Sequence, residues 1–177
     1  FAPDNRYGFF PSGAIAWRIS DENFLKEVNW LDDLKIKFSV GKTGVQNFDR
    51  GGHANKDLYS TGSYMDEPTI YHSQLANRDI RWETTVQYDF GIDFTVLGNV
   101  LSGSLAYYRK NTEDLIWEYT APSSLGLTGS IPRNIGAVRN QGIELSLRAH
   151  LFQNNEDWKW ELGLNAAGNR NKGTRLG

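Results

Sequence analysis

Residues 86–96 alternate between apolar and polar side chains without interruption. Consecutive side chains of an extended strand point to opposite faces, so this period of two predicts a β-strand with one apolar and one polar face. The apolar members are Val86, Tyr88, Phe90, Ile92, Phe94 and Val96. Such a strand needs a nonpolar environment on one side and water on the other. A soluble sheet with one buried face provides this, and so does the wall of a transmembrane barrel.

Five other segments carry strand-like alternation, namely residues 9–20, 34–41, 100–119, 136–152 and 158–166. Together with the central strand they predict an all-β fold of six antiparallel strands. The connections at 97–99 and 153–157 are short, whereas those at 42–78 and 120–133 are long and lack periodicity. Residues 21–33 form the exception, for which we expect a short helical turn capped by Ser20 or Asp21. Short turns at one end and long loops at the other are typical of outer-membrane barrels.

The polar faces of these strands carry many charges, which are costly in a dry core and tolerated in a water-filled lumen. We therefore predict that the lumen is faced by Lys35, Lys37, Asp89, Asp93, Glu144 and Arg148. The predicted lipid-facing residues are Val86, Tyr88, Phe90, Ile92, Phe94, Leu145 and Leu147. Glu144 and Arg148 are expected to pair with neighbouring strands. The same charges also suit the solvated face of a soluble sheet, so that alternative stays open.

Tryptophans gather near the expected strand ends, which is typical of the aromatic girdles at membrane interfaces. The short-turn end has Trp17, Trp30, Trp158 and Trp160, and the long-loop end has Trp82 and Trp117. Tyrosines are frequent in and beside the two long loops. Tyr59, Tyr64, Tyr71 and Tyr119 are candidate ligand-binding residues, because aromatic rings stack on sugars and other flat groups. Rings of this kind also pack a loop against itself.

The amino-acid composition argues against several classes of function. The formal net charge is −2, from 19 basic and 21 acidic residues, so no basic field attracts nucleic acid. There are no cysteines, which excludes disulfides and thiol catalysis. The three histidines, His53, His72 and His150, lack metal-binding spacing, and His53 with Asp49 and Asp57 is the nearest approach to a metal cluster. We expect no enzyme activity, cofactor or metal, and no apolar run approaches the ~20 residues of a membrane helix.

Six strings of the sequence occur in a fixed order and are informative together: FPSGAIAWRIS (10–20), LKIKFSVGKTG (34–44), DIRWETTVQYDFGIDF (79–94), YYRKNTEDLI (107–116), NIGAVRNQGIELSL (134–147) and NAAGNRNK (165–172). They resemble one family, the TonB-dependent outer-membrane transporters of Gram-negative bacteria, in their SusC/RagA-like subfamily. Their order and spacing are similar to the middle-to-late part of that subfamily's barrel. The chain is accordingly identified as an internal piece of a longer protein.

This resemblance implies a bacterial outer-membrane barrel of ~22 strands, of which residues 1–177 form part of the single barrel domain. The plug domain and the remaining strands would lie outside this chain. The implied partners are a SusD-like surface lipoprotein, the TonB complex, membrane lipid, and an oligosaccharide or peptide cargo. Contacts with the cargo and the lipoprotein would then be expected within residues 47–71 and 119–133. Two alternatives remain open: a soluble all-β glycan-binding sandwich with the apolar faces turned inward, and a passive porin or barrel-anchored surface protein.

Overall fold

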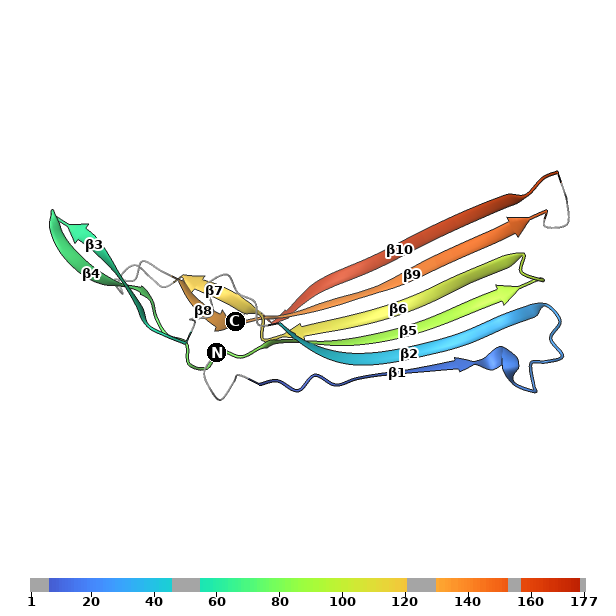
Figure 1. Cartoon of the computed structure of the whole chain (residues 1–177), viewed down its shortest axis with the longest axis horizontal. Helices are drawn as coiled ribbons and strands as arrows, with labels where there is room; N and C mark the ends of the chain where they lie inside the picture. Colours follow the sequence, from blue (N-terminus) through green and yellow to red (C-terminus); the bar gives the residue numbers. More distant parts are fainter. Residues whose placement is uncertain (1–6, 46–54, 121–129, 153–156, 176–177) are drawn as a thin grey trace.

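The computed structural model of this chain describes residues 7–45, 55–120, 130–152 and 157–175. Its main element is one antiparallel sheet whose six long strands lie side by side (Figure 1). In spatial order they are β1 (Ser12–Arg18), β2 (Leu31–Val45), β5 (Glu83–Val96), β6 (Leu101–Glu113), β9 (Ala137–Leu151) and β10 (Trp160–Arg175). The six predicted strands are confirmed.

The two long connections are not structureless, and here the sequence-based prediction was wrong. Residues 42–45 extend β2, and the first connection then forms a hairpin of β3 (Leu58–Tyr64) and β4 (Glu67–Gln74). The fourth strand ends at Glu113 rather than continuing to residue 119, because Asp114 has a φ of 55° that breaks the extended chain. A second hairpin pairs β7 (Ile116–Thr120) with β8 (Ser130–Asn134).

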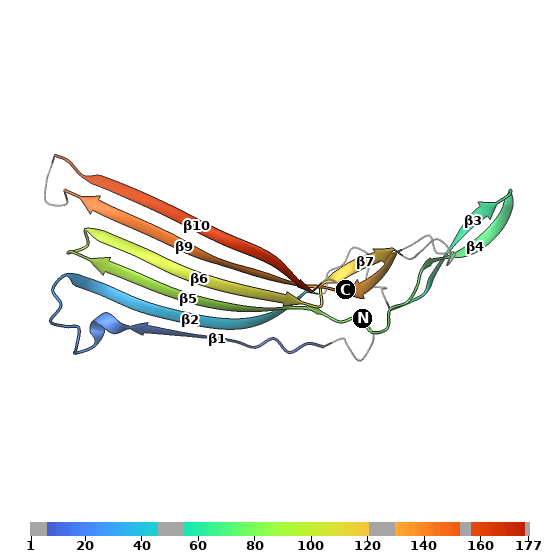
Figure 2. The same cartoon turned by 180° about the vertical axis from the view of Figure 1, so that it is seen from behind.

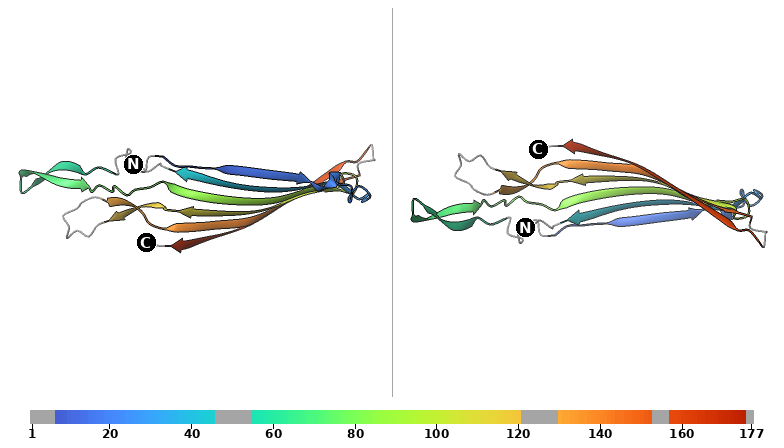
Figure 3. Two further views of the ribbon diagram at one scale, coloured as in Figure 1. Left: turned by 90° about the horizontal axis from the view of Figure 1, so that it is seen from below. Right: turned by 90° about the horizontal axis from the view of Figure 1, so that it is seen from above.

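Both hairpins extend beyond one end of the sheet, and the short turns lie at the other end (Figures 1 and 2). The same separation is visible from below and from above (Figure 3). The predicted division into a short-turn end and a long-loop end is therefore confirmed. The β5–β6 turn is tight because Leu97, Gly98 and Asn99 have φ values of 60°, 65° and 66°, the left-handed conformation that tight hairpin turns use.

The connection between β1 and β2 differs in detail from its prediction. It contains one turn of 3₁₀ helix, η2 (Ile19–Asp21). Successive backbone hydrogen bonds follow as far as Leu31, each from the N–H of one residue to the carbonyl oxygen of the residue three positions earlier. Neither Ser20 nor Asp21 caps it, since the N-cap residue is Arg18 and no side-chain cap is present. The Ser20 hydroxyl donates to Asp33 Oδ1 at 3.0 Å, a contact that joins the connection to the start of β2. Within the described residues, no helix has the length and apolar character needed to cross a membrane.

The register aligns apolar side chains across all six strands. One row contains Ile15, Phe38, Phe90, Tyr107, Ile143 and Gly168, and the next contains Trp17, Ile36, Ile92, Leu105, Leu145 and Ala166. We call the face that these rows share the apolar face and its opposite the polar face. The two faces differ in composition along the whole mid-part of the sheet, because every strand keeps its alternation in register with its neighbours.

The apolar face is not covered. Ile15 is 68% exposed, Ile143 54% and Leu164 58%, and the buried hydrophobic residues of the described chain are only Ile80, Val96 and Ile131. Among the described residues, no second sheet lies over this face. The strands β1 and β10 are also edges, with no second neighbouring strand among the residues that the structure describes. The sheet therefore lacks a core of its own, and its stability requires further surfaces on one face and at both edges.

Candidate functional site

The polar face carries a line of cross-strand contacts between charged and polar side chains. Lys37 Nζ lies 2.6 Å from Asp93 Oδ2, and Ser39 Oγ donates to Asp89 Oδ2 at 3.0 Å. Both contacts join β2 to β5. Lys37 and Asp93 are 46% and 35% exposed, so water screens the pair and we expect it to add ~1 kcal/mol or less. This part of the polar face is thus hydrophilic: the charges of Lys37 and Asp93 neutralise each other, and both side chains remain accessible to solvent.

A similar contact joins β9 to β10 farther along the same face. Arg148 Nε lies 3.0 Å from Glu161 Oε1, and His150 Nδ1 lies 4.0 Å from Glu161 Oε2. The expected pairing of Arg148 with a neighbouring strand is therefore confirmed. Glu144 shares the polar face but forms no ion pair with the described residues, and the same is true of Lys35. In register, all six charged residues predicted for the lumen lie on this one face.

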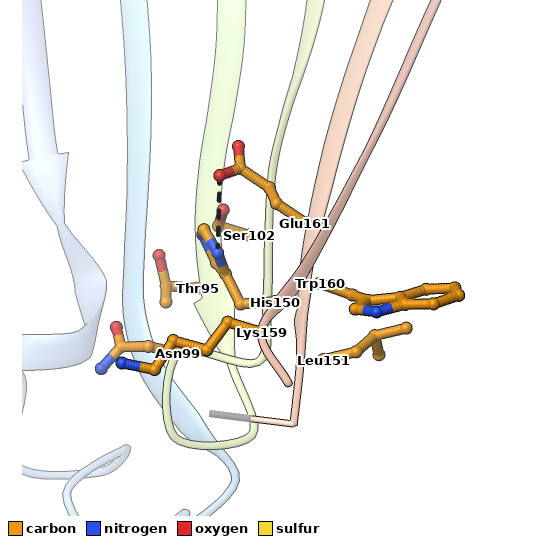
Figure 4. A pocket seen from close by; sticks show the side chains of 8 residues that line it. All are labelled: Thr95, Asn99, Ser102, His150, Leu151, Lys159, Trp160 and Glu161. Atoms are coloured by element: carbon orange, nitrogen blue, oxygen red, sulfur yellow. Dashed lines mark ion pairs between the residues drawn. The ribbon is translucent and has the colours of Figure 1, made fainter. Parts of the chain in front are cut away.

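A hollow of about 710 Å³ opens on the polar face near the short-turn end (Figure 4). Its polar lining comes from Thr95, Asn99, Ser102, His150, Lys159 and Glu161. Leu151 and Trp160 border it as well, but Figure 4 shows them pointing away from the polar side chains. In the described residues no group of three or more potential metal ligands comes together. The possible cluster around His53 and Asp49 lies outside the described residues.

The four candidate tyrosines are distributed over separate surfaces. Tyr59 faces His72 across the β3–β4 ladder with ring centroids 4.3 Å apart. Tyr64 and Tyr71 lie on the opposite face of that hairpin, because the register offsets them from Tyr59 by an odd number of residues. Tyr119 belongs to β7 in the other hairpin. The structure therefore does not bring these rings together into one site.

A different group on the β7–β8 hairpin combines aromatic rings with a cation. The Arg133 Cζ atom lies 5.1 Å above the centre of the Tyr119 ring, within the range of a cation–π contact. Trp117 pairs with Arg133 in register, on the same face, and 67% of Trp117 is exposed. We call Trp117, Tyr119 and Arg133 the aromatic–arginine surface. Trp117 lies beyond the sheet, so its predicted place in an aromatic girdle is not supported.

Side-chain amides fix the base of this hairpin, a role that the sequence analysis missed. Asn134 Oδ1 accepts from the Arg81 backbone N–H at 2.8 Å, and Asn134 Nδ2 donates to the carbonyls of Arg81 at 2.9 Å and Asp114 at 2.8 Å. Asn77 Nδ2 donates to the Pro132 carbonyl at 2.7 Å. These contacts attach the segment before β5 to β8. The aromatic–arginine surface is therefore held in a defined position at the long-loop end of the sheet.

Trp82 marks the point where the chain enters the sheet at the long-loop end. The centroid of its ring lies 5.3 Å from the centroid of the Phe10 ring, and the two ring planes are inclined at 53°. The other end has Trp30, Trp158 and Trp160, which are 59%, 62% and 54% exposed. Large exposed indoles at a strand end are consistent with the girdle predicted there.

Comparison with known proteins gives a single answer. Residues 1–175 match the family described as TonB dependent receptor-like, beta-barrel. The chain is 35% identical over 183 aligned residues to the TonB-dependent receptor SusC of Bacteroides thetaiotaomicron, covering 99% of this chain and 18% of SusC. It is 34% identical over 178 residues to the TonB-dependent receptor P3 of Formosa agariphila, again covering 99% of this chain and 18% of the relative.

A solved structure agrees with this assignment. The RagAB peptide importer in its closed-closed state superposes with a TM-score of 0.84 at 32% identity, covering 99% of this chain and 19% of that one. The chain thus spans less than a fifth of the length of the relatives it matches. Each of these similarities extends along almost the whole chain and includes both the sheet and the hairpins. The chain therefore belongs to the TonB-dependent receptor β-barrel family, and within it to the SusC/RagA-like proteins.

Proposed function

We propose that this chain is a wall and outer-loop segment of an active importer in the bacterial outer membrane. The observation that carries the proposal is the uncovered apolar face. On β5 it runs from Val86 to Val96, ~33 Å along the strand at about 3.3 Å per residue. A strand tilt of ~40° reduces that length to ~25 Å, the height of the apolar band of an outer-membrane barrel. Lipid would supply the cover that the chain lacks.

The polar face supports the same proposal from the other side. Contacts such as Lys37 with Asp93 and Arg148 with Glu161 retain solvent exposure, which a water-filled or plug-facing lumen permits. Closure of the barrel would also pair the free edges of β1 and β10, so that no backbone group meets lipid without a hydrogen bond. In this arrangement the residues predicted as lipid-facing and lumen-facing take those roles. No residue of the segment is required to perform covalent chemistry.

The hairpins would contribute to the outer vestibule, where cargo is first met. The aromatic–arginine surface offers flat rings for sugar or peptide groups and a guanidinium for carboxylates or carbonyl oxygens. Oligosaccharide or peptide is therefore the proposed class of cargo, and the structurally similar RagAB is itself a peptide importer. By analogy with these relatives, a SusD-like lipoprotein would cover the vestibule and the TonB complex would supply energy through parts outside this chain.

The test is extraction of the full-length protein from outer membranes, followed by identification of what co-purifies. We expect recovery only in detergent, together with a surface lipoprotein, and uptake of cargo that stops when TonB is inactivated. Recovery in plain buffer would contradict the membrane assignment and would favour a soluble sandwich. Recovery in detergent with uptake independent of TonB would instead indicate a passive pore.

A further inference from the structure

Four basic side chains gather on the apolar face at its long-loop end. They are Arg109 on β6, Arg139 on β9, and Arg170 and Lys172 on β10. The register puts Arg109 and Arg170 in one row, and Arg139 and Lys172 in the next. With strands ~4.8 Å apart and alternate residues ~6.7 Å apart, their Cα atoms fall within roughly 12 Å of one another. We call these four residues the basic rim.

The basic rim comes next after the last apolar residues of β6 and β10 on this face, and on β9 Gln141 separates Arg139 from Ile143. Tyr107 and Gly168 lie in the row of Phe90 and Ile143. Arg109 comes two residues after Tyr107, and Arg170 comes two residues after Gly168. On β2, Lys42 likewise follows Val40 on the same face. On β2, β6, β9 and β10 cations therefore begin where the apolar side chains end, whereas β5 stays apolar in the same rows at Tyr88 and Val86. In a membrane this level corresponds to the headgroups of the leaflet on the loop side.

The basic rim has little internal compensation. Among the described residues, none of its four members has a carboxylate within ion-pair distance, whereas Arg175 lies 3.5 Å from Asp114. Glu113 is the remaining acid on this part of the face, one row farther out. Arg109 Nε is buried and has no hydrogen-bond partner in the structure. Asn111 accepts from Arg139 Nε at 3.0 Å, which orients that guanidinium and leaves its terminal nitrogens available.

The opposite end of the apolar face is different. It ends on Leu31, Val96, Leu101, Ala149, Leu162 and Trp160, and the described strand residues on this face include no lysine or arginine there. On the apolar face, the positive charge of the described strands is thus confined to the loop-side end. A ligand that is merely apolar would not require this asymmetry. A lipid whose anionic headgroups lie only in the leaflet on the loop side would require this asymmetry.

We propose that the basic rim binds the phosphate groups of a phosphorylated lipid in the outer leaflet. Guanidinium groups suit this ligand, because their paired N–H donors match phosphate oxygens, and the adjoining Tyr107 and Ile143 would contact the acyl chains. The inference rests on the proposed function, since it requires the apolar face to meet lipid. It adds a specific lipid site on the outside of the wall, separate from any cargo site in the lumen or vestibule.

The test uses the full-length protein, purified in detergent, with diphosphoryl lipid A as the probe. Its dephosphorylated form and inorganic phosphate are the comparison ligands, and binding is followed by native mass spectrometry. The rim variant is Arg170→Gln with Lys172→Gln, two exposed residues of β10. The matched control is Lys35→Gln with Lys110→Gln, which removes the same charge from the polar face.

We expect the wild-type protein to bind diphosphoryl lipid A about 10-fold more tightly than the dephosphorylated form, and the rim variant to lose about that factor. The control variant should bind like the wild type. Equal binding by rim variant and wild type would overturn the inference, as would equal affinity for the two lipids. Displacement of the lipid by millimolar inorganic phosphate would show a site for free phosphate and would also overturn it.

Failure of this inference is distinguishable from failure of the proposed function. A protein that is recovered only in detergent and imports cargo, but shows no phosphate-dependent lipid binding, refutes the lipid site alone. A protein that is recovered without detergent refutes both. Because both rim substitutions replace exposed cations by neutral polar groups, normal assembly of the variant is expected, and its electrophoretic heat-modifiability verifies this in the same samples.

Discussion

The six-stranded sheet and the two hairpins beyond it use the same backbone geometry but are stabilised in different ways. In the sheet, strands of up to 16 residues are paired along most of their length, and alternation assigns each side chain to a face. In the hairpins, strands of 5 to 8 residues carry polar groups on both faces. Their positions depend on single amides such as Asn134 and Asn77. Regular pairing therefore makes the sheet, and individual side chains determine where the hairpins lie.

The largest expected effect is a charge placed on the apolar face of the sheet. Leu105→Arg puts a guanidinium in the middle of that face, where lipid contact would cost ~2–4 kcal/mol of stability. Ser104→Arg is the matched control, because the adjacent residue of β6 points to the polar face beside Asp93. Urea unfolding of the full-length protein in lipid vesicles measures both. Equal stabilities would mean that the two faces of the sheet meet the same solvent.

A second effect within the sheet comes from close strand packing at Gly103. A Cβ atom there would lie 2.7 Å from both Leu147 Cδ2 and Phe94 Cζ and 2.8 Å from the backbone oxygen of Ser146. Gly103→Ala should therefore cost ~1–3 kcal/mol through strain. In Gly41→Ala the nearest atom is Ser12 Cβ at 3.5 Å, an ordinary contact, so this control should be nearly neutral. The same unfolding assay compares them, and a neutral Gly103→Ala would refute the packing described for β6.

The hairpins should respond to loss of their amide contacts without a change in the sheet. Asn134→Ala removes three hydrogen bonds and leaves the Arg81 amide unpaired, at a cost of ~1–3 kcal/mol to the hairpin base. Hydrogen exchange should become faster in β7 and β8 and stay unchanged in β5 and β9. Asn165→Ala on the polar face of β10 is the control. Faster exchange throughout the sheet would show that the two regions are not separable.

Removal of the exposed indole tests whether the aromatic–arginine surface takes part in recognition. Trp117→Ala should weaken cargo binding by ~1–2 kcal/mol, about 5- to 30-fold, with little change in stability because the ring is 67% exposed. Tyr64→Ala, in the other hairpin and 69% exposed, is the comparison. Calorimetric titration with the proposed class of cargo, an oligosaccharide or a peptide, gives both affinities. A larger effect at Tyr64 would move the binding surface to the β3–β4 hairpin.

The smallest effect is expected at the ion pairs of the polar face. Asp93→Asn removes the partner of Lys37 at 2.6 Å, yet both groups reach solvent, so the loss should stay below ~1 kcal/mol. The loss should also shrink in high salt, because exposed charges are screened. Unfolding in 50 mM and 500 mM salt checks this. A loss of several kcal/mol would indicate a dry environment and would contradict a water-filled lumen.

The sheet could be predicted from the sequence because its pattern is the period of the backbone itself. Phe90, Ile92 and Phe94 share a face in any extended strand, and six such runs joined by alternately short and long connections favour one antiparallel arrangement. The predicted ends and caps of the individual elements were less accurate. The helical turn after β1 was predicted with caps that the structure lacks, because Ser20 and Asp21 lie inside η2, whose N-cap residue is Arg18.

The hairpins were missed because they lack the usual local signals. The β3–β4 turn uses Met65 and Asp66, with φ values of 51° and 64°, where Asn-Gly or Asp-Gly is the common sequence. Asn134 could not be identified as a fixing residue, since its partners Arg81 and Asp114 are 53 and 20 positions away. The same limitation applies to the aromatic–arginine surface. Tyr119 is noticeable by itself, but its contact with Arg133 depends on the β7–β8 register.

The most direct test of the account is to measure what each face of β5 contacts. Single spin labels at residues 87–94 of the full-length protein in lipid vesicles report collision with oxygen, which concentrates in lipid, and with a water-soluble nickel chelate. We predict a period of two, with oxygen favoured at Tyr88, Phe90, Ile92 and Phe94 and the chelate favoured at Gln87, Asp89, Gly91 and Asp93. Low collision with both reagents at the even positions would contradict the account, because it would mean that protein covers the apolar face.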